Sequence, residues 1–380
     1  MKPQVVCIDD IERYALDNLN KSVADYYRSG ANDEQTLAEN RRAFARLRIR
    51  PRFLRDVSQR SLRTTVLGQP IAAPVCASPS AMQKMAHPMG ELATAKACET
   101  MDTIMILSTI STSSIEEVAA EASVAMKWFQ LYIYRDREVT RQLVERAERS
   151  GFGALVLTVD TPMFGHRLAD SRNGFCLPPH LRMANFVAGA QASDAIQNRP
   201  TDGQSGLSEY AQSLFDPSIE WKDLRWLRSI TRLPIVVKGV LTREDALLAL
   251  KYGCSAILVS NHGARQLDGV PATIEALPEV VKAVQNRCEV YLDGGVRTGT
   301  DVLKALALGA RAVFIGRPIL WGLAYDGQSG VEKVFSILKQ ELDMAMALSG
   351  LSTVTDIANQ STTSSSSPLV VSENYYRSQL

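Results

Sequence analysis

The stretch Gly253-Cys254-Ser255-Ala256-Ile257-Leu258-Val259 ends a helical pattern at a glycine and continues as a short apolar run. Glycine is frequent just after a helix, and an apolar run of about four to eight residues is typical of a buried strand. The same pattern recurs at 151–157 and at 309–315. We interpret the three stretches as copies of one helix–strand unit, although ordinary connections between a helix and a strand share these features.

Outward from this unit, strand-length apolar runs alternate with amphipathic helical patterns along most of the chain. The expected strands are 71–77, 103–108, 126–131, 153–159, 234–238, 255–260, 289–293 and 312–316. The expected helices include 90–101, 136–150, 242–252, 273–287 and 299–309. Eight strands separated by helices are typical of a parallel (β/α)8 barrel, the TIM barrel. We therefore expect an α/β protein with a single TIM barrel over about 71–350, within one domain of residues 1–358.

Three regions lie outside the repeat. Residues 1–70 predict an N-terminal helical extension with helices at 11–28 and 33–46, the second capped by Asn32. Residues 165–222 form a long insertion after the fourth strand, which is either a lid or disordered. Residues 359–380 are rich in serine and predict a flexible tail without a core of its own.

The composition is that of an ordinary globular protein. The 380 residues include 42 Lys and Arg against 41 Asp and Glu, which gives a formal net charge of +1. Nucleic-acid and membrane surfaces need clustered positive charge, and no apolar run is long enough to span a bilayer, so neither partner is expected. The six cysteines form no C-x-x-C pair, so no metal site is expected and a reducing compartment is favoured.

Each expected strand leads into polar or charged residues at its carboxyl end, where barrels of this type build their active sites. A purely structural barrel does not need such groups at all eight strands. In chain order they are Pro79, Ser80 and Ala81; Ser108; Gln130 and Tyr132; Thr158 and Asp160; Lys238; Ser260, His262 and Arg265; Asp293; and Gly316 with Arg317.

Two of these strand ends have the composition of a phosphate site. Asp293-Gly294-Gly295-Val296-Arg297 follows the seventh strand, and Ile315-Gly316-Arg317-Pro318 follows the eighth. Glycine allows close backbone approach, and an arginine fork suits a phosphate. Barrels often place a phosphate at the loops after these two strands, so we expect the pair to bind one, although each alone could be an ordinary turn.

His262 is the expected general base. It is the only one of the four histidines that lies at a strand end with an arginine, Arg265, three residues later. Asp160 could orient this histidine and stabilise its charged form. His166, beside Arg167 in the long insertion, is the alternative base. Lys238 ends an apolar strand, and a lysine buried there needs an anion nearby.

With these residues in view, the sequence resembles the FMN-dependent 2-hydroxy acid oxidase family, close to its animal glycolate oxidases, over about residues 5–350. The matching stretches are Asp25-Tyr26-Tyr27-Arg28-Ser29-Gly30-Ala31, Ala81-Met82-Gln83-Lys84-Met85-Ala86-His87, Gln130-Leu131-Tyr132, Leu157-Thr158-Val159-Asp160-Thr161-Pro162, Val237-Lys238-Gly239, Ser260-Asn261-His262-Gly263-Ala264-Arg265-Gln266-Leu267-Asp268 and Asp293-Gly294-Gly295-Val296-Arg297. Seven motifs in the family's order make the resemblance specific.

The resemblance implies FMN as cofactor, with N5 of the flavin as hydride acceptor, and oxidation of L-2-hydroxy acids to 2-oxo acids, with O2 giving H2O2. His262 would be the base, supported by Asp160; Tyr26, Arg265 and Arg167 would bind the substrate carboxylate, and Tyr132 would contact the hydroxyl region. Residues from 79–81, Ser108, Gln130, Thr158, Lys238 and Ser260 would line the flavin and ribityl chain. Asp293, Gly294, Gly295, Arg297, Gly316 and Arg317 would hold the ribityl and phosphate end.

The resemblance leaves alternatives open. A dehydrogenase of the same family would pass electrons to a carrier instead of O2, and a flavin-binding barrel would not turn over at all. Close relatives have Trp at the position of Ile110, which implies a wider substrate pocket here. The family also suggests a homotetramer. The C-terminal Ser378-Gln379-Leu380 is similar to a peroxisomal address, with the cytosol as the alternative location.

Overall fold

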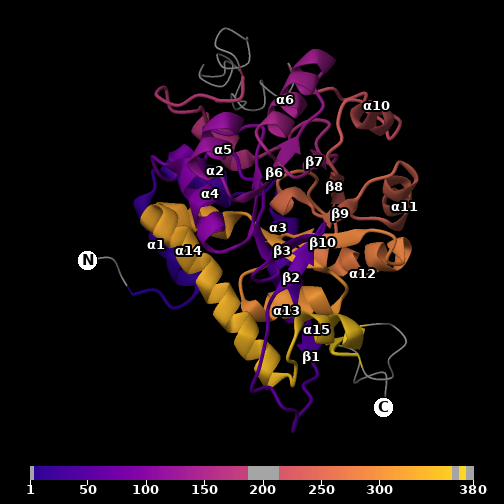
Figure 1. The fold of residues 1–380 in the computed structure, drawn as a ribbon. Helices are drawn as coiled ribbons and strands as arrows, with labels where there is room; N and C mark the ends of the chain where they lie inside the picture. The colour runs from indigo at the N-terminus through magenta and orange to yellow at the C-terminus, as the bar shows by residue number, and fades with distance from the viewer. Residues whose placement is uncertain (1–3, 187–213, 362–367, 374–380) are drawn as a thin grey trace.

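Eight parallel strands close a barrel at the centre of the molecule (Figure 1). The computed structural model describes residues 4–186, 214–361 and 368–373. In barrel order the strands are β10 (Glu289–Asp293), β11 (Ala312–Ile315), β4 (Val75–Ala77), β5 (Ile104–Leu107), β6 (Met126–Leu131), β7 (Leu155–Thr158), β8 (Ile235–Val240) and β9 (Ala256–Val259). The predicted TIM barrel is confirmed, and each predicted strand overlaps one of these eight.

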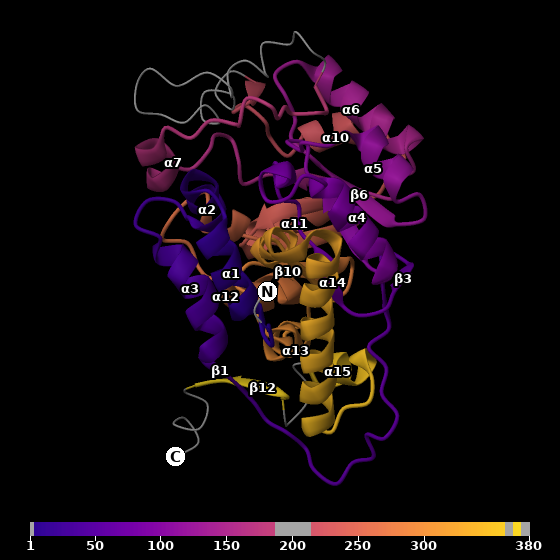
Figure 2. The same ribbon diagram turned by 90° about the vertical axis from the view of Figure 1, so that its left-hand side faces the viewer.

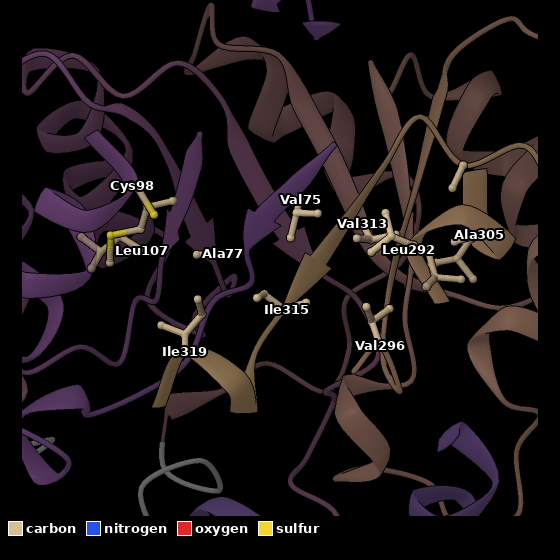
Figure 3. Close-up of a cluster of buried hydrophobic side chains, with 14 of the residues drawn as sticks. Val75, Ala77, Cys98, Leu107, Leu292, Val296, Ala305, Val313, Ile315 and Ile319 are labelled. Carbon is tan, nitrogen blue, oxygen red and sulfur yellow. The ribbon is translucent and has the colours of Figure 1, made fainter. Parts of the chain in front are cut away.

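Helices surround the barrel and bury one face against it. They are α4 (Gly90–Thr100), α5 (Ile115–Glu121), α6 (Arg137–Arg149), α10 (Asp223–Ser229), α11 (Arg243–Lys251), α12 (Thr273–Val284), α13 (Gly299–Ala307) and α14 (Arg317–Leu348). Figure 3 shows part of the apolar layer between strands and helices, in which Ile315 of β11 lies near Ile319 of α14 and Val313 lies near Leu292 of β10. Alternate strand residues point to this layer and to the barrel interior, as strand geometry requires.

The barrel interior is a separate apolar cluster that includes Trp128, Tyr291 and Phe314, with neighbouring ring centroids 5.6–5.9 Å apart. A two-stranded hairpin of β2 (Thr64–Val66) and β3 (Gln69–Ile71) adds Val66 and Ile71 to the cluster. The predicted strand 71–77 is therefore wrong at its start, because Ile71 belongs to this hairpin and only Val75–Ala77 joins the barrel.

The N-terminal extension contains three helices, α1 (Ile8–Asn18), α2 (Lys21–Arg28) and α3 (Gln35–Ala45). The single helix predicted at 11–28 is wrong, because Asn20 caps a new helix by accepting a hydrogen bond from the N–H of Ser22 at 3.0 Å. The predicted Asn32 cap of α3 is also wrong. The N–H groups of Gln35 and Thr36 instead donate to the carboxylate of Asp268, which is distant from them in sequence.

Parts of the insertion and of the C-terminal segment form helix and strand, which the composition did not indicate. The insertion contains α7 (Leu168–Asn173), and its residues 187–213, on which the choice between lid and disorder depends, lie outside the described residues. The flexible tail predicted from residue 359 is wrong for 370–372, because β12 (Val370–Ser372) pairs with β1 (Leu47–Ile49) beside α15 (Val354–Ser361) (Figure 2). Val370 and Val371 are buried there, so this segment has a core to join.

Candidate active site

A pocket opens at the carboxyl ends of the barrel strands. Most of the predicted site residues line it: Tyr26, Pro79, Ser80, Ala81, Ser108, Ile110, Gln130, Tyr132, Thr158, Arg167, Lys238, His262, Arg265, Asp293, Gly294, Gly295, Arg297, Gly316 and Arg317. Asp160 and Ser260 are outside this lining, but both contact His262. The alternative base His166 is exposed and does not line the pocket.

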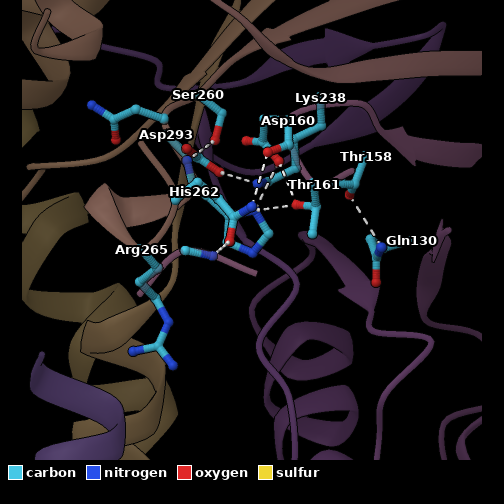
Figure 4. Close-up of polar contacts among 12 residues, drawn as sticks. Gln130, Thr158, Asp160, Thr161, Lys238, Ser260, His262, Arg265 and Asp293 are labelled. Atoms are coloured by element: carbon cyan, nitrogen blue, oxygen red, sulfur yellow. Dashed lines mark hydrogen bonds and ion pairs between the residues drawn. The ribbon is translucent and has the colours of Figure 1, made fainter. Parts of the chain in front are cut away.

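His262 and Asp160 form a hydrogen-bonded pair at the pocket (Figure 4). Nδ1 of the histidine lies 2.9 Å from Oδ1 of Asp160 and 3.2 Å from Oγ1 of Thr161, whose hydroxyl also donates to the same carboxylate oxygen at 2.9 Å. A carboxylate partner fixes the proton of a neutral imidazole on Nδ1. Nε2 is therefore the nitrogen left to accept a proton.

The electrostatics of the pair suit a base. Burial lowers the pKa of His262 below 6.5, and the opposing charge of Asp160 does not fully offset this. Burial alone would raise the pKa of Asp160, but the charges of His262 and Lys238 together with its hydrogen bonds lower it below 3.8. At neutral pH the histidine is consequently neutral and the aspartate ionised, which is the state that a proton acceptor requires.

The loop that carries His262 has an unusual backbone. His262, Gly263 and Ala264 have φ values of 57°, 61° and 64°, all in the left-handed region. Only glycine occupies this region freely, so the loop needs outside support. Part of that support comes from Ser260, whose Oγ accepts from the N–H of His262 at 3.1 Å, and from Asn261, whose Oδ1 accepts from the N–H of Ala264 at 3.2 Å.

Gly239 permits the aspartate to reach the histidine. It follows Lys238 in β8, has a φ of 112°, and a Cβ placed on it would lie 2.7 Å from both Cβ and Cγ of Asp160. No real Cβ contact is that short, so any side chain here would displace the carboxylate. Sequence analysis missed this role of Gly239, because the approach joins two neighbouring strand ends and leaves no local pattern.

Two guanidinium groups, of which that of Arg167 is buried, make the pocket a site for an anion. Arg167 is 6% exposed and shares the lining with Arg265, whose Nη1 donates to the carbonyl oxygens of Tyr26 and Ser29 at 2.5 and 3.1 Å. Burial, and then the charge of Arg265, lower the pKa of Arg167 to about 10. A carboxylate of Asp170 lies 3.9 Å from Arg167, which leaves excess positive charge for a bound anion to neutralise.

Aromatic side chains shape the same end of the pocket. Tyr26 stacks on Phe175 with ring centroids 4.3 Å apart, and the guanidinium of Arg265 lies 4.7 Å from the centroid of the Tyr26 ring. Tyr132 stacks on Phe215 at 4.5 Å. Burial raises the pKa of both tyrosines, so each keeps its hydroxyl proton and can donate a hydrogen bond.

The opposite end of the pocket has the donors and acceptors of a hydroxylated, phosphorylated ligand. Asp293 accepts from Ser78 at 2.9 Å, and its Oδ2 lies 3.7 Å from Nζ of Lys238, which is 4% exposed. Among the described residues, the buried Oδ1 of Asp293 has no hydrogen-bond partner and is open to a ligand. Nε of Arg297 makes no hydrogen bond either, but it lies 3.6 Å from Oε2 of Glu12 and forms an ion pair with it.

Glycines bring the backbone close at this end. Gly294 and Gly295 have φ values of 95° and 83°, and a Cβ on Gly295 would lie 1.9 Å from the carbonyl oxygen of Asn40. Arg317 lines the pocket too, but it also donates to the carbonyl oxygens of Tyr27, Ser29 and Gly263, each at 2.9 Å. These three bonds join the N-terminal extension to the His262 loop. Burial lowers the pKa of Arg317 to about 9.

Sequence analysis did not assign several lining residues. They are Tyr27, Ser78, Phe164, Gly263, Val296, Phe314, Ile315 and Leu320. Most are neighbours in sequence of residues that it did assign, so a signal existed for them. Phe164 had none, because it lies just before the long insertion and not at a strand end.

One barrel rim carries a proton acceptor, a pair of arginines that suits an anion, and an end that suits a phosphate. This combination is typical of a barrel enzyme that acts on an anionic substrate with a phosphorylated cofactor. Comparison with known proteins agrees. The model of the FMN-dependent dehydrogenase family matches residues 15–364. The chain therefore belongs to the FMN-dependent dehydrogenase family.

Its relatives are similar over nearly their whole length. The chain is 57% identical to 2-hydroxyacid oxidase 1 of Homo sapiens over 354 residues, which cover 93% of this chain and 95% of that protein. It is 53% identical to glycolate oxidase of Spinacia oleracea over 357 residues, with 93% and 95% covered. The crystal structure of mandelate oxidase with (S)-4-hydroxymandelic acid matches with a TM-score of 0.89 and 42% identity, covering 93% of this chain and 98% of that one.

The residues of the pocket fit the FMN that the family uses. FMN consists of a flavin ring, a hydroxylated ribityl chain and a phosphate. The open oxygen of Asp293 suits a ribityl hydroxyl, and the guanidinium of Arg297, which lines the pocket with Gly294 and Gly295, suits a phosphate. Among the described residues, no helix is long and apolar enough to cross a membrane.

Proposed function

We propose that this protein is an FMN-dependent oxidase that converts L-2-hydroxy acids to 2-oxo acids and reduces O2 to H2O2. The observation that carries the proposal is His262, hydrogen-bonded to Asp160, in the same pocket as Arg167 and Arg265. A 2-hydroxy acid has both features that this arrangement addresses, a carboxylate and a hydroxyl-bearing carbon. When bound, FMN supplies the acceptor for the two electrons.

The residues of this chain bind the substrate and accept its proton. Arg265 and Arg167, with the hydroxyl of Tyr26, hold the substrate carboxylate, and Tyr132 donates to the hydroxyl region. Nε2 of His262 takes the proton, and Asp160 stabilises the imidazolium that forms. Burial of these groups strengthens each interaction, because few waters compete.

The family resemblance and the lining of the pocket support one place for the cofactor. Lys238 would lie next to the flavin ring, where its cation would stabilise the negative charge that the ring gains on reduction. The other ring and ribityl contacts would come from Pro79, Ser80, Ala81, Ser108, Gln130, Thr158 and Ser260. The ribityl and phosphate end would be held by Asp293, Gly294, Gly295, Arg297, Gly316 and Arg317.

Anaerobic mixing of the holoenzyme with a panel of 2-hydroxy acids tests the function. The oxidase should lose the yellow colour of its flavin and recover it with H2O2 production when O2 returns. Bleaching with slow recovery would favour the alternative dehydrogenase, which passes its electrons to a carrier. A protein that binds FMN but does not bleach with any acid would be a non-catalytic flavin barrel.

Ile110 should widen the range of substrates. It lies in the pocket at a position where the resemblance places Trp in close relatives, and Ile is the smaller side chain. We expect kcat/KM for 2-hydroxy acids of about six carbons to exceed that for glycolate, since each methylene buried is worth about 0.8 kcal/mol. Ile110→Trp should reverse the preference. A wild-type enzyme that strongly prefers glycolate would contradict the assignment.

Two further properties belong to the same proposal. The family resemblance supports a homotetramer, which light scattering of the purified protein checks. The terminal Ser378-Gln379-Leu380, which lies outside the described residues, supports peroxisomal import. A fluorescent reporter carrying residues 361–380 should enter peroxisomes, whereas diffuse cytosolic signal would favour the cytoplasm.

A further inference from the structure

Glu91 is a fully buried carboxylate that only hydrogen bonds satisfy. It is 0% exposed, and no ion pair reaches it within the described ranges. Its Oε1 accepts from the N–H of Gln83 at 2.9 Å and from the N–H of Thr112 at 2.8 Å. The hydroxyls of Thr112 and Ser113 donate to it as well, at 2.8–3.1 Å. Leaving such a group or its donors unpaired would be costly.

These contacts join two loops that line the pocket. Gln83 belongs to the loop after β4, which carries Ser80 and Ala81, and Thr112 belongs to the loop after β5, which carries Ser108 and Ile110. The two loops also touch directly, since the N–H of Met82 donates to the carbonyl of Ile110 at 3.2 Å. The side-chain amide of Gln83 donates to the carbonyl of Ser80 at 3.3 Å, so the contact extends to a lining residue.

The start of α4 is built to bring Glu91 to this place. Gly90, with a φ of 44°, packs so closely that a Cβ on it would lie 2.7 Å from the backbone nitrogen of Lys84. That nitrogen donates to Oγ1 of Thr112 at 3.0 Å, which is itself bonded to Glu91. Glu91 lies in the first turn of the helix, where the helix dipole favours a negative charge.

We propose that Glu91 is a positioning residue for FMN, which sets the relative placement of the loops after β4 and β5. It does not line the pocket and acts only through the residues it holds. The inference rests on FMN binding at this site and not on the identity of the substrate. FMN affinity measured without substrate therefore separates it from the proposed oxidase activity.

The test compares the FMN dissociation constant of three variants, by quenching of FMN fluorescence, with their melting temperatures as apoproteins. Glu91→Ala leaves the two backbone donors unpaired and should raise Kd at least about tenfold. Glu91→Gln should stay within about threefold, because its amide oxygen can accept from both N–H groups while its NH2 faces two hydroxyls that can accept. Thr112→Val removes the hydroxyl alone and should fall between them.

Glu289→Ala is the matched control. Glu289 accepts from the N–H of Leu67 at 3.1 Å and from the hydroxyl of Tyr291 at 2.6 Å, at the start of β10 and hence at the opposite end of the barrel. It should lower the melting temperature without changing Kd. If Glu91→Ala does not fold, Thr112→Val decides the question. A wild-type Kd in Glu91→Ala and in Thr112→Val, or an equal rise in Glu289→Ala, would overturn the proposal.

Discussion

At the scale of single residues, His262 has an unfavourable backbone conformation and an imidazole whose pKa is lowered, as a base at neutral pH requires. Its φ of 57° and that of Ala264 at 64° each cost about 1–3 kcal/mol for residues other than glycine. The loop keeps this conformation because the side-chain amide of Gln266 also donates to the carbonyl oxygens of Asp160 and Met163, in the segment after β7, at 2.9 and 2.8 Å. These hydrogen bonds therefore hold the loop in the conformation that places the imidazole against Asp160.

Replacement of the base should separate chemistry from cofactor binding. We expect His262→Ala to retain FMN and to lose at least about 100-fold in the rate of flavin reduction, because no other group takes the proton. In the wild-type enzyme kcat/KM should rise with pH through a pKa below 6.5 and stay level toward neutrality, since burial lowers the pKa of His262. Stopped-flow absorbance measures both. Near-normal bleaching in the variant would refute the assignment.

Gly239 should be essential for the hydrogen bond between Asp160 and His262, because of its close approach to Asp160 and not only because of its positive φ. A Cβ in Gly239→Ala would lie 2.7 Å from Asp160, so the carboxylate should move away from Nδ1 of His262 and kcat/KM should fall at least about tenfold. Gly151→Ala is the control, because Gly151 has a φ of 74° but nothing within 4 Å of its added Cβ. Both variants should lose stability, about 1 kcal/mol. Equal activities would show that contact with Asp160 is unimportant.

At the scale of elements, the N-terminal helix α3 and the His262 loop depend on one another. Asp268 ends the loop and accepts from the N–H of Thr36 at 2.8 Å and of Gln35 at 3.2 Å, so a residue distant in sequence caps the helix. Asn40 of the same helix exchanges two hydrogen bonds with Asn261, at 2.9 and 2.8 Å. The extension is consequently part of the catalytic unit and not a separate module.

Loss of this cap should lower stability in a pH-dependent way. Asp268→Ala should cost about 1 kcal/mol, as loss of an N-cap typically does. Burial would raise the pKa of Asp268, but the bonds from Thr36 and Gln35 lower it below 3.8. The stabilisation is therefore fully present above about pH 4 and is lost as the pH falls through the lowered pKa. Thermal melts at pH 7 and pH 3 measure this.

The control for that measurement is Asp56→Ala. Asp56 accepts from the N–H of Ser58 at 2.9 Å in an exposed turn and caps no helix. Its loss should change the melting temperature little at either pH. If the two aspartate variants melt alike at pH 7, the carboxylate of Asp268 contributes no helix cap.

At the scale of the whole molecule, local pattern predicted the barrel well and its surroundings less well. Strands such as β6 and β10 are confirmed to the residue, because a buried parallel strand is a continuous apolar run whatever its neighbours. The helix break at Asn20 and the strand at Val370–Ser372 were missed. The helix break depends on a single capping residue, and the strand depends on a pairing partner more than three hundred residues away.

The sequence by itself determined the (β/α)8 barrel and the set of groups on its rim, since apolar periodicity and strand ends are local properties of the chain. It also indicated His262 over His166, because a strand end is a definite place in this fold. Only the tertiary structure decided how those groups meet: Asp160 against His262 across Gly239, and Asp268 on α3. Such contacts join segments that are distant in sequence, where burial and close approach act and local pattern carries no information.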